Sequence, residues 1–130
     1  MENDGYSYNE LVLKSFGHPQ HAGALSVAGP QHIGQAQESA HGSRVILRCH
    51  FDGQRISEMR FSAWGCPHFI AAAEMLCAAL ETRTLAELGT FDIRDIQKVL
   101  AVPVEKTGRI LTLEDALEAL KASLSQAKGR

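Results

Sequence analysis

The sequence predicts an α+β fold in which a small antiparallel sheet of three strands packs against several helices. Strand-like runs gather in the first half of the chain and helical patterns in the second, without the strand–helix alternation that parallel sheets require. Two of these runs flank the dipeptide Asp52-Gly53, which is a strong hairpin signal. The 130 residues, 45% of them hydrophobic and 22% charged, suit one core without disulfide support, so we expect a single domain over residues 1–130.

The first third of the chain predicts one helix followed by loop. Residues 6–16 are expected to form a short amphipathic helix, which Gly17 and Pro19 end. Its apolar residues recur at helical spacing: Tyr8, Leu11, Val12 and Phe16. Residues 17–42 are rich in Gly, Pro, Gln, His, Ser and Ala, which favours loop, and residues 24–27 are the one stretch there that could form a further strand.

The middle of the chain predicts a hairpin that leads directly into a helix. Residues 44–51 (RVILRCHF) and 54–61 (QRISEMRF) read as two antiparallel strands. Trp64 and Gly65 then end the sheet, and Pro67 stands where the first residue of a helix tolerates proline. Cys66 is therefore expected near the N-cap of a helix that runs to residue 80.

The last third predicts three helices. The segment from Thr84 to Glu87 resembles a capping box, and helices are expected over residues 92–100 and 112–127. The last of them carries its apolar residues on one face: Leu113, Ala116, Leu117, Leu120 and Leu124. Pro103 and Gly108 are expected to separate the last two helices.

Charge and composition exclude several classes of function. Thirteen basic and fifteen acidic residues give a net charge of -2 without a long block of either sign, which argues against capture of nucleic acid or anionic lipid. The acidic N-terminus has no apolar core of a secretory signal, and three cysteines without a CxxC pair favour reduced thiols, so we expect a cytoplasmic protein. No Ser-His-Asp order, carboxylate pair or phosphate-cradling loop stands out, so we expect no enzyme activity.

Cys66 is the first candidate for chemistry. A thiol at a helix N-terminus meets the positive end of the helix dipole, which favours the thiolate form that binds soft metals or attacks sulfur. The alternative is a buried cysteine that acts as a small hydrophobic residue. Packing is the expected role of Cys77, inside an apolar helix, and of Cys49, in the middle of a strand.

Two of the six histidines are placed to join Cys66 at a metal site. His41 ends the Gly-rich segment at the mouth of the hairpin, and His68 lies two residues beyond Cys66. The alternative is that both are solvated or capping histidines. Two or three mixed ligands also fall short of the four that a structural zinc site needs.

Several motifs carry a resemblance to a known family. The run MRFSAWGCPHFIAAA from Met59 to Ala73 resembles the pattern ARF-x-x-x-GC-x-x-x-IAS of the U-type iron–sulfur cluster assembly scaffolds, the IscU and NifU N-terminal family. The segments FGHPQHAG, VPVEK and LEDAL are similar to the family's F-x-NPRNVG, LPPVK and AEDAI. The likeness covers residues 6–124 and implies the α+β fold of that family.

The resemblance also implies roles for individual residues. The family holds its nascent cluster with three cysteines, and of these positions only the second is a cysteine here, Cys66. The first falls on His41 and the third on Arg109, which cannot ligate iron but can stabilise a thiolate, as can Lys106. Cys66 with His41 and His68 would then bind iron, zinc or a transient iron–sulfur cluster.

Two functions follow from the resemblance. In the first, the protein is a scaffold that receives sulfur from a cysteine desulfurase at Cys66 and contacts an Hsp70-class chaperone through Val102, Pro103 and Lys106. In the second, it is a degenerate paralogue without a cluster that acts as an interaction or regulatory module of the assembly machinery. A monomer or weak homodimer is expected in either case.

Overall fold

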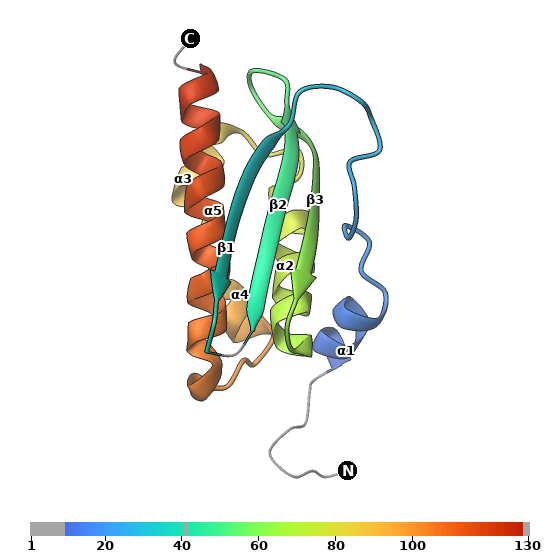
Figure 1. Cartoon of the computed structure of the whole chain (residues 1–130), viewed down its shortest axis with the longest axis vertical. Coiled ribbons are helices and arrows are strands. Elements are labelled where there is room, and N and C mark those ends of the chain that lie inside the picture. The colour runs from blue at the N-terminus through green and yellow to red at the C-terminus, as the bar shows by residue number, and fades with distance from the viewer. Residues whose placement is uncertain (1–9, 41, 129–130) are drawn as a thin grey trace.

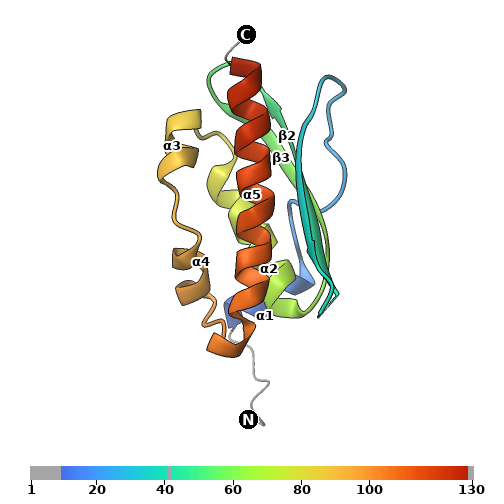
Figure 2. The same cartoon turned by 60° about the vertical axis from the view of Figure 1, so that its left-hand side comes forward.

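The computed structural model describes residues 10–40 and 42–128. It contains one antiparallel sheet with strand order β1-β2-β3, and the helices cover one face of that sheet (Figures 1 and 2). The elements in chain order are α1 (Glu10–Gly17), β1 (His32–Glu38), β2 (Ser43–Phe51), β3 (Ile56–Trp64), α2 (Pro67–Leu80), α3 (Leu85–Thr90), α4 (Arg94–Val99), η1 (Val104–Lys106) and α5 (Thr107–Lys128). Among the described residues, no helix is long and apolar enough to cross a membrane. The predicted α+β class is confirmed.

The predicted hairpin is confirmed as β2 and β3, with a loop longer than two residues. The last pair of the ladder is Phe51 with Ile56, and a bulge interrupts the ladder beside it. The backbone N–H of Asp52 donates to the Arg55 carbonyl at 3.0 Å, while the Asp52 carboxylate accepts from the backbone N–H groups of Gln54 and Arg55. These local hydrogen bonds take the place of the first inter-strand pairs of the hairpin. β3 therefore begins at Ile56 and not at residue 54.

The third strand lies where the sequence did not predict it. Residues 24–27 do not form a strand, and β1 is instead His32–Glu38, paired with β2 from His32–Cys49 to Glu38–Ser43. A Cβ atom on Gly34 would collide with the Ala116 carbonyl and the Leu120 backbone of α5. Position 34 on the inner face of β1 therefore has no room for a side chain, because α5 packs directly against it.

The core lies between the inner face of the hairpin and the helices α2 and α5. All five apolar residues predicted for one face of the last helix are buried, which confirms that prediction. They meet two kinds of partner, the inner side chains of β2 and β3 and the apolar side chains of α2: Val45, Leu47, Met59, Phe61, Phe69, Ala73 and Leu76. The sheet and these two long helices thereby fix where the loops between them end.

The helix boundaries agree with the sequence except at the last helix. Pro67 is the first residue of α2, and Thr84 with Glu87 forms the predicted capping box of α3. The last helix begins at Thr107, five residues earlier than predicted, so Gly108 lies within its first turn and does not separate two helices. The start of the first helix, with Tyr8, lies outside the described residues.

Residues 18–31 form a long connection that we call the strap. It runs from α1 to β1 past the free edge of β3 (Figure 1). The Gly23 N–H donates to the Phe61 carbonyl at 2.8 Å, and the Phe61 N–H donates to the His21 carbonyl at 2.9 Å. The strap thus satisfies backbone groups of an edge strand that would otherwise be open to pairing.

Candidate functional site

Four predicted site residues come together at one end of the molecule, which we call the thiol pole: Cys66, His68, Lys106 and Arg109. This is the end at which β3 runs into α2 and at which α5 begins, at the bottom of Figure 1. The segments that supply the residues are about forty positions apart in the chain. The shared core of α2 and α5 is what brings them together.

Cys66 is the N-cap of α2, as predicted. Its backbone is extended, with φ -76° and ψ 165°, and its side chain makes no capping hydrogen bond to the helix. A Cβ atom on Gly65 would lie 3.0 Å from the Phe69 ring, so the chain turns tightly into the helix just before the thiol. The Sγ atom is therefore not tied to the amide groups of the first turn.

The three thiols differ in exposure. None is in a disulfide, but Cys66 is half-buried whereas Cys49 and Cys77 are buried. Burial raises the pKa of Cys49 to about 12, and burial followed by the nearby carboxylates raises the pKa of Cys77 well above its usual range. Cys66 is therefore the one cysteine whose thiol solvent and partners can reach.

His68 is buried and turned toward the two basic residues of the pole. Its Nδ1 atom accepts a hydrogen bond from Lys106 Nζ at 3.1 Å. Burial, and then the positive charges of Lys106 and Arg109, lower the pKa of His68 to about 4. The ring is neutral near pH 7, and a metal ion at Nδ1 would have to displace Lys106.

Two buried polar atoms at this end have no hydrogen-bond partner in the described part of the chain. One is Nε of Arg109, in the first turns of α5, and the other is Oγ of Ser43, at the start of β2. The end of β1 lies beside them, because Glu38 Oε2 is 3.9 Å from where a Cβ of Gly108 would stand. Buried polar groups are usually hydrogen-bonded, so these two atoms stand out among the polar groups of the described residues.

The charges of the thiol pole favour anions. Lys106 and Arg109 are both cationic, and the positive end of the α2 dipole points at Cys66. Two carboxylates stand near these cations: Glu38 Oε2 is 3.9 Å from where a Cβ of Gly108 would stand, and Glu105 lies in η1 just before α5. A negatively charged sulfur species on Cys66 would face the positive end of the α2 dipole, and the two cations lie beside His68, two residues further along the chain.

The other predicted site residues are placed differently. His41 lies outside the described residues. Val102 is buried, and Pro103 lies just before η1 and is half-buried. Within the described ranges, no group of three or more His, Cys, Asp or Glu side chains is arranged to hold a metal ion.

One pair beside the site was missed by the sequence reasoning. Arg44 and Trp64 face each other across β2 and β3, with the guanidinium carbon 4.7 Å from the centre of the indole ring. Trp64 is 49% exposed and lies two residues before Cys66. The bulge between His50 and Phe51 sets the register of this pair, and no sequence signal marks that bulge.

Comparison with known proteins identifies the family. The family model for the NifU-like N terminal domain matches residues 7–129. The chain belongs to this family. The resemblance seen in the sequence motifs is thereby confirmed.

Curated relatives of this NifU-like domain share about a third or a quarter of its residues. It is 32% identical over 98 residues to the bifunctional protein NifU/MnmA of Rubrobacter xylanophilus, covering 75% of the chain but only 20% of that much longer protein. It is 27% identical over 125 residues to the iron–sulfur cluster assembly scaffold protein IscU of Azotobacter vinelandii, covering 95% of the chain and 98% of the relative.

A solved structure supports the fold of the domain. The N-terminal NifU-like protein of Brucella abortus superposes with a TM-score of 0.71, at 15% identity and over 94% of both chains. At this identity the likeness concerns the fold alone. It confirms that the three-stranded sheet and its helices form the architecture of the NifU-like N-terminal domain.

Proposed function

We propose that this NifU-like domain serves in iron–sulfur cluster assembly as a scaffold-like carrier whose sulfur-accepting group is Cys66. The observation that carries the proposal is the setting of this thiol, which is half-buried at the N-cap of a fourteen-residue helix, at a pole that also holds Lys106 and Arg109. The relative that matches it over 95% of the chain is named as a scaffold protein of this process.

The proposed step is a transfer of sulfane sulfur from a protein persulfide. The Cys66 thiolate attacks the outer sulfur of the donor's R–S–SH group, and a new S–S bond forms at Cys66. The S–S bond of the donor breaks, and the donor leaves as its thiolate. Cys66 then carries the persulfide, no external oxidant or reductant is consumed, and the proton remains on the transferred sulfur until solvent takes it.

The basic residues of the pole supply the electrostatics of this step. Lys106 and Arg109 stabilise the attacking thiolate and the persulfide anion that follows it. The neutral His68 ring holds Lys106 by accepting its hydrogen bond at Nδ1, so it positions the ammonium group without adding a charge that the site must balance.

Metal is part of the proposed cargo. Iron or zinc would bind the Cys66 thiolate with His41 and His68, and a transient iron–sulfur cluster would need further ligands from a partner or a second chain. A reducing compartment such as the cytoplasm suits this chemistry, because Cys66 must remain a free thiol.

The proposed partners are a cysteine desulfurase, as the persulfide donor, and an Hsp70-class chaperone. The chaperone segment predicted from Val102, Pro103 and Lys106 is largely enclosed in the folded chain, since Val102 is buried and Lys106 bonds to His68. The side chain that stands out there is Val104, which is 84% exposed. A chaperone that binds the folded domain would therefore contact Val104 first.

A second function has its own supporting observation. Arg109 stands where the family has a third cysteine, and a guanidinium group cannot ligate iron. This difference favours an interaction module that binds the assembly machinery without carrying a cluster. In that case the chain would bind a desulfurase and accept neither sulfur nor metal.

The two functions are separated by anaerobic reconstitution with ferrous iron, L-cysteine and a cysteine desulfurase. The visible spectrum and the iron per chain are recorded for the wild type, Cys66→Ser and His41→Ala, with Cys77→Ala as the matched control in the core. The scaffold proposal expects a sulfur-to-iron charge-transfer band in the wild type and the Cys77 variant, and its loss in Cys66→Ser and His41→Ala. No band in the wild type, together with retained desulfurase binding, would support the interaction module instead.

A further inference from the structure

The strap is attached to the rest of the molecule mainly by polar contacts. Ser26 donates from its N–H and its hydroxyl to Glu58 Oε2, at 2.7 and 2.6 Å. His21 donates its backbone N–H to Glu74 Oε1 at 2.8 Å. Most side chains of the strap are exposed. A segment held in this way opens more easily than the core and depends on the charges of its partners.

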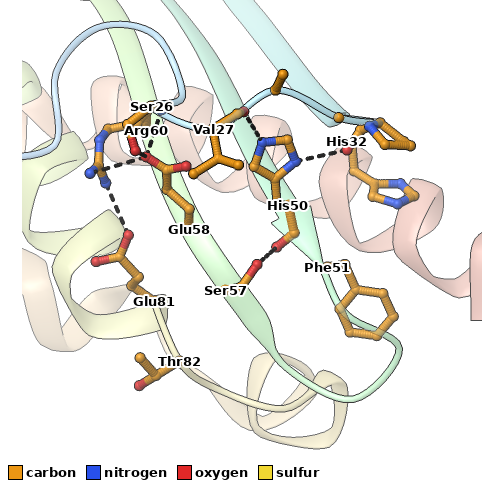
Figure 3. A pocket seen from close by; sticks show the side chains of 13 residues that line it. Ser26, Val27, His32, His50, Phe51, Ser57, Glu58, Arg60, Glu81 and Thr82 are labelled. Atoms are coloured by element: carbon orange, nitrogen blue, oxygen red, sulfur yellow. Dashed lines mark hydrogen bonds and ion pairs between the residues drawn. The ribbon is translucent and has the colours of Figure 1, made fainter.

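His50, on β2, lies between two carbonyl groups of the strap. Its Nε2 atom is 2.6 Å from the Val27 carbonyl oxygen, and its Nδ1 atom is 2.8 Å from the Pro30 carbonyl oxygen (Figure 3). A carbonyl oxygen can only accept, so each ring nitrogen must carry a proton for both hydrogen bonds to form. The arrangement therefore requires the imidazolium form of His50.

His21, on the strap itself, has the same kind of surroundings. Its Nδ1 atom is 2.7 Å from Glu74 Oε2, and its Nε2 atom is 3.2 Å from Glu81 Oε1, both on or next to α2. Carboxylates also only accept when ionised, so this geometry again needs both ring nitrogens to donate. Two histidines thus fasten the same segment, one at each half of the strap.

The other charged groups near these rings form a connected set. Glu58 on β3 faces His50, and Arg60 on β3 bonds to Glu58 and Glu81 (Figure 3). His32 on β1 lines the same cavity as His50. Arg60 neutralises much of the carboxylate charge, so the second proton on His50 is supported chiefly by the Val27 and Pro30 carbonyls that it bonds.

We propose that the strap is a proton-dependent latch, closed while the His50 ring carries both of its protons and loosened when that ring becomes neutral. Loss of one proton removes one of the two hydrogen bonds of the His50 ring, and an unprotonated nitrogen then faces a carbonyl oxygen. Opening exposes the backbone N–H and C=O groups of Phe61 on the edge of β3.

Opening would also remove one wall of a cavity. Residues 26–30 of the strap line a cavity of about 530 Å³ together with side chains of β2 and β3 (Figure 3). The latch therefore controls access to this cavity and to the edge of β3. Another extended chain can pair with an exposed strand edge of this kind as a further strand.

The direction of the pH effect follows from His50 and Glu58. The Val27 and Pro30 carbonyls raise the pKa of His50 above its ordinary value, so its contribution to closure is complete below that value and is lost as the pH rises through the raised pKa. Hydrogen bonds from the Ser26 hydroxyl and amide lower the pKa of Glu58, so its contribution is lost only as the pH falls through that lowered value. Between these limits the strap is closed.

Hydrogen exchange of the full chain, followed by mass spectrometry from about pH 5.5 to about pH 8.5, tests the latch because this range brackets the ordinary pKa of histidine. The protection factor of residues 18–31 should fall roughly tenfold as the pH rises, while that of β2 stays constant. His50→Gln should remove this change. His18→Gln, an exposed histidine of the same strap, is the matched control and should behave as the wild type.

A direct titration of the histidine side chains by NMR checks the same claim without a substitution. The His50 ring of the wild type should carry two protons at about pH 6.5 and titrate above this ordinary pKa of histidine. Protection of the strap that does not change with pH, a pH change that survives in His50→Gln, or a His50 ring that is neutral while the strap is protected would each overturn the proposal.

Discussion

Cys66 owes its accessibility to its immediate neighbours. Pro67 has no N–H group to cap, and the Cys66 side chain makes no capping bond, so its sulfur atom is left for other partners. Cys49 and Cys77 are packed in the core, where burial keeps their thiols protonated. The same residue type thus has two different roles in one small domain, and exposure decides between them.

At the residue scale, His68 gives the pole a measurable pH dependence. Its folded-state pKa, lowered to about 4, lies below the ordinary value of about 6.5, so the unfolded chain takes up a proton that the folded chain refuses. The free energy of unfolding should therefore fall as the pH drops from about 6.5 toward 4. Urea unfolding across this range should show a shallower fall in His68→Gln, and equal slopes in the two proteins would contradict this account.

At the element scale, the packing of β1 against α5 depends on the absence of a side chain at Gly34. A Cβ atom there would collide with the Ala116 carbonyl and the Leu120 backbone, so Gly34→Ala should destabilise the fold by about 3 kcal/mol. Denaturant midpoints measure this change. Gly89→Ala in α3 is the control, since a Cβ there meets nothing within 4 Å, and it should leave stability unchanged or slightly higher. A Gly34 variant as stable as the control would refute the close contact.

The elements that the sequence predicts well are those with local signals. The hairpin follows from alternating apolar residues, α2 from the proline after Cys66, and α3 from the reciprocal bonds of Thr84 and Glu87. β1 has no such signal, because its inward-facing Gly34 packs against α5, about eighty residues later in the chain, and has no room for a side chain. Only the folded structure reveals that contact.

The site was predictable to a similar extent. Cys66 at a helix N-terminus and the basic residues of the pole follow from local sequence and from the family motifs. The bond of His68 to Lys106, the cation–π contact of Arg44 with Trp64 and the contacts of His21 and His50 do not, since each joins separate elements. Their partners are fixed by tertiary packing and by the register of β2 and β3, which a bulge shifts.

On the scale of the whole molecule, the thiol proposed to accept sulfur and the strap proposed to act as a latch lie in different regions. The thiol pole lies where β3 meets α2 and where α5 begins, whereas the strap and its cavity lie along the outer side of β3 (Figure 1). Changes in one region therefore need not disturb the other. The proposed sulfur transfer rests on Cys66, and the proposed latch rests on His50, so each can fail without the other.

The most direct test of the central claim is to find where sulfur binds. The wild type, Cys66→Ser and Cys77→Ala are incubated anaerobically with a cysteine desulfurase and L-cysteine, and intact and peptide masses then locate any added sulfur. We predict one added sulfur atom on Cys66 in the wild type and in Cys77→Ala, and none in Cys66→Ser. Sulfur that appears equally on Cys66→Ser, or a wild type that acquires none while still binding the desulfurase, would contradict Cys66 as the sulfur-accepting group.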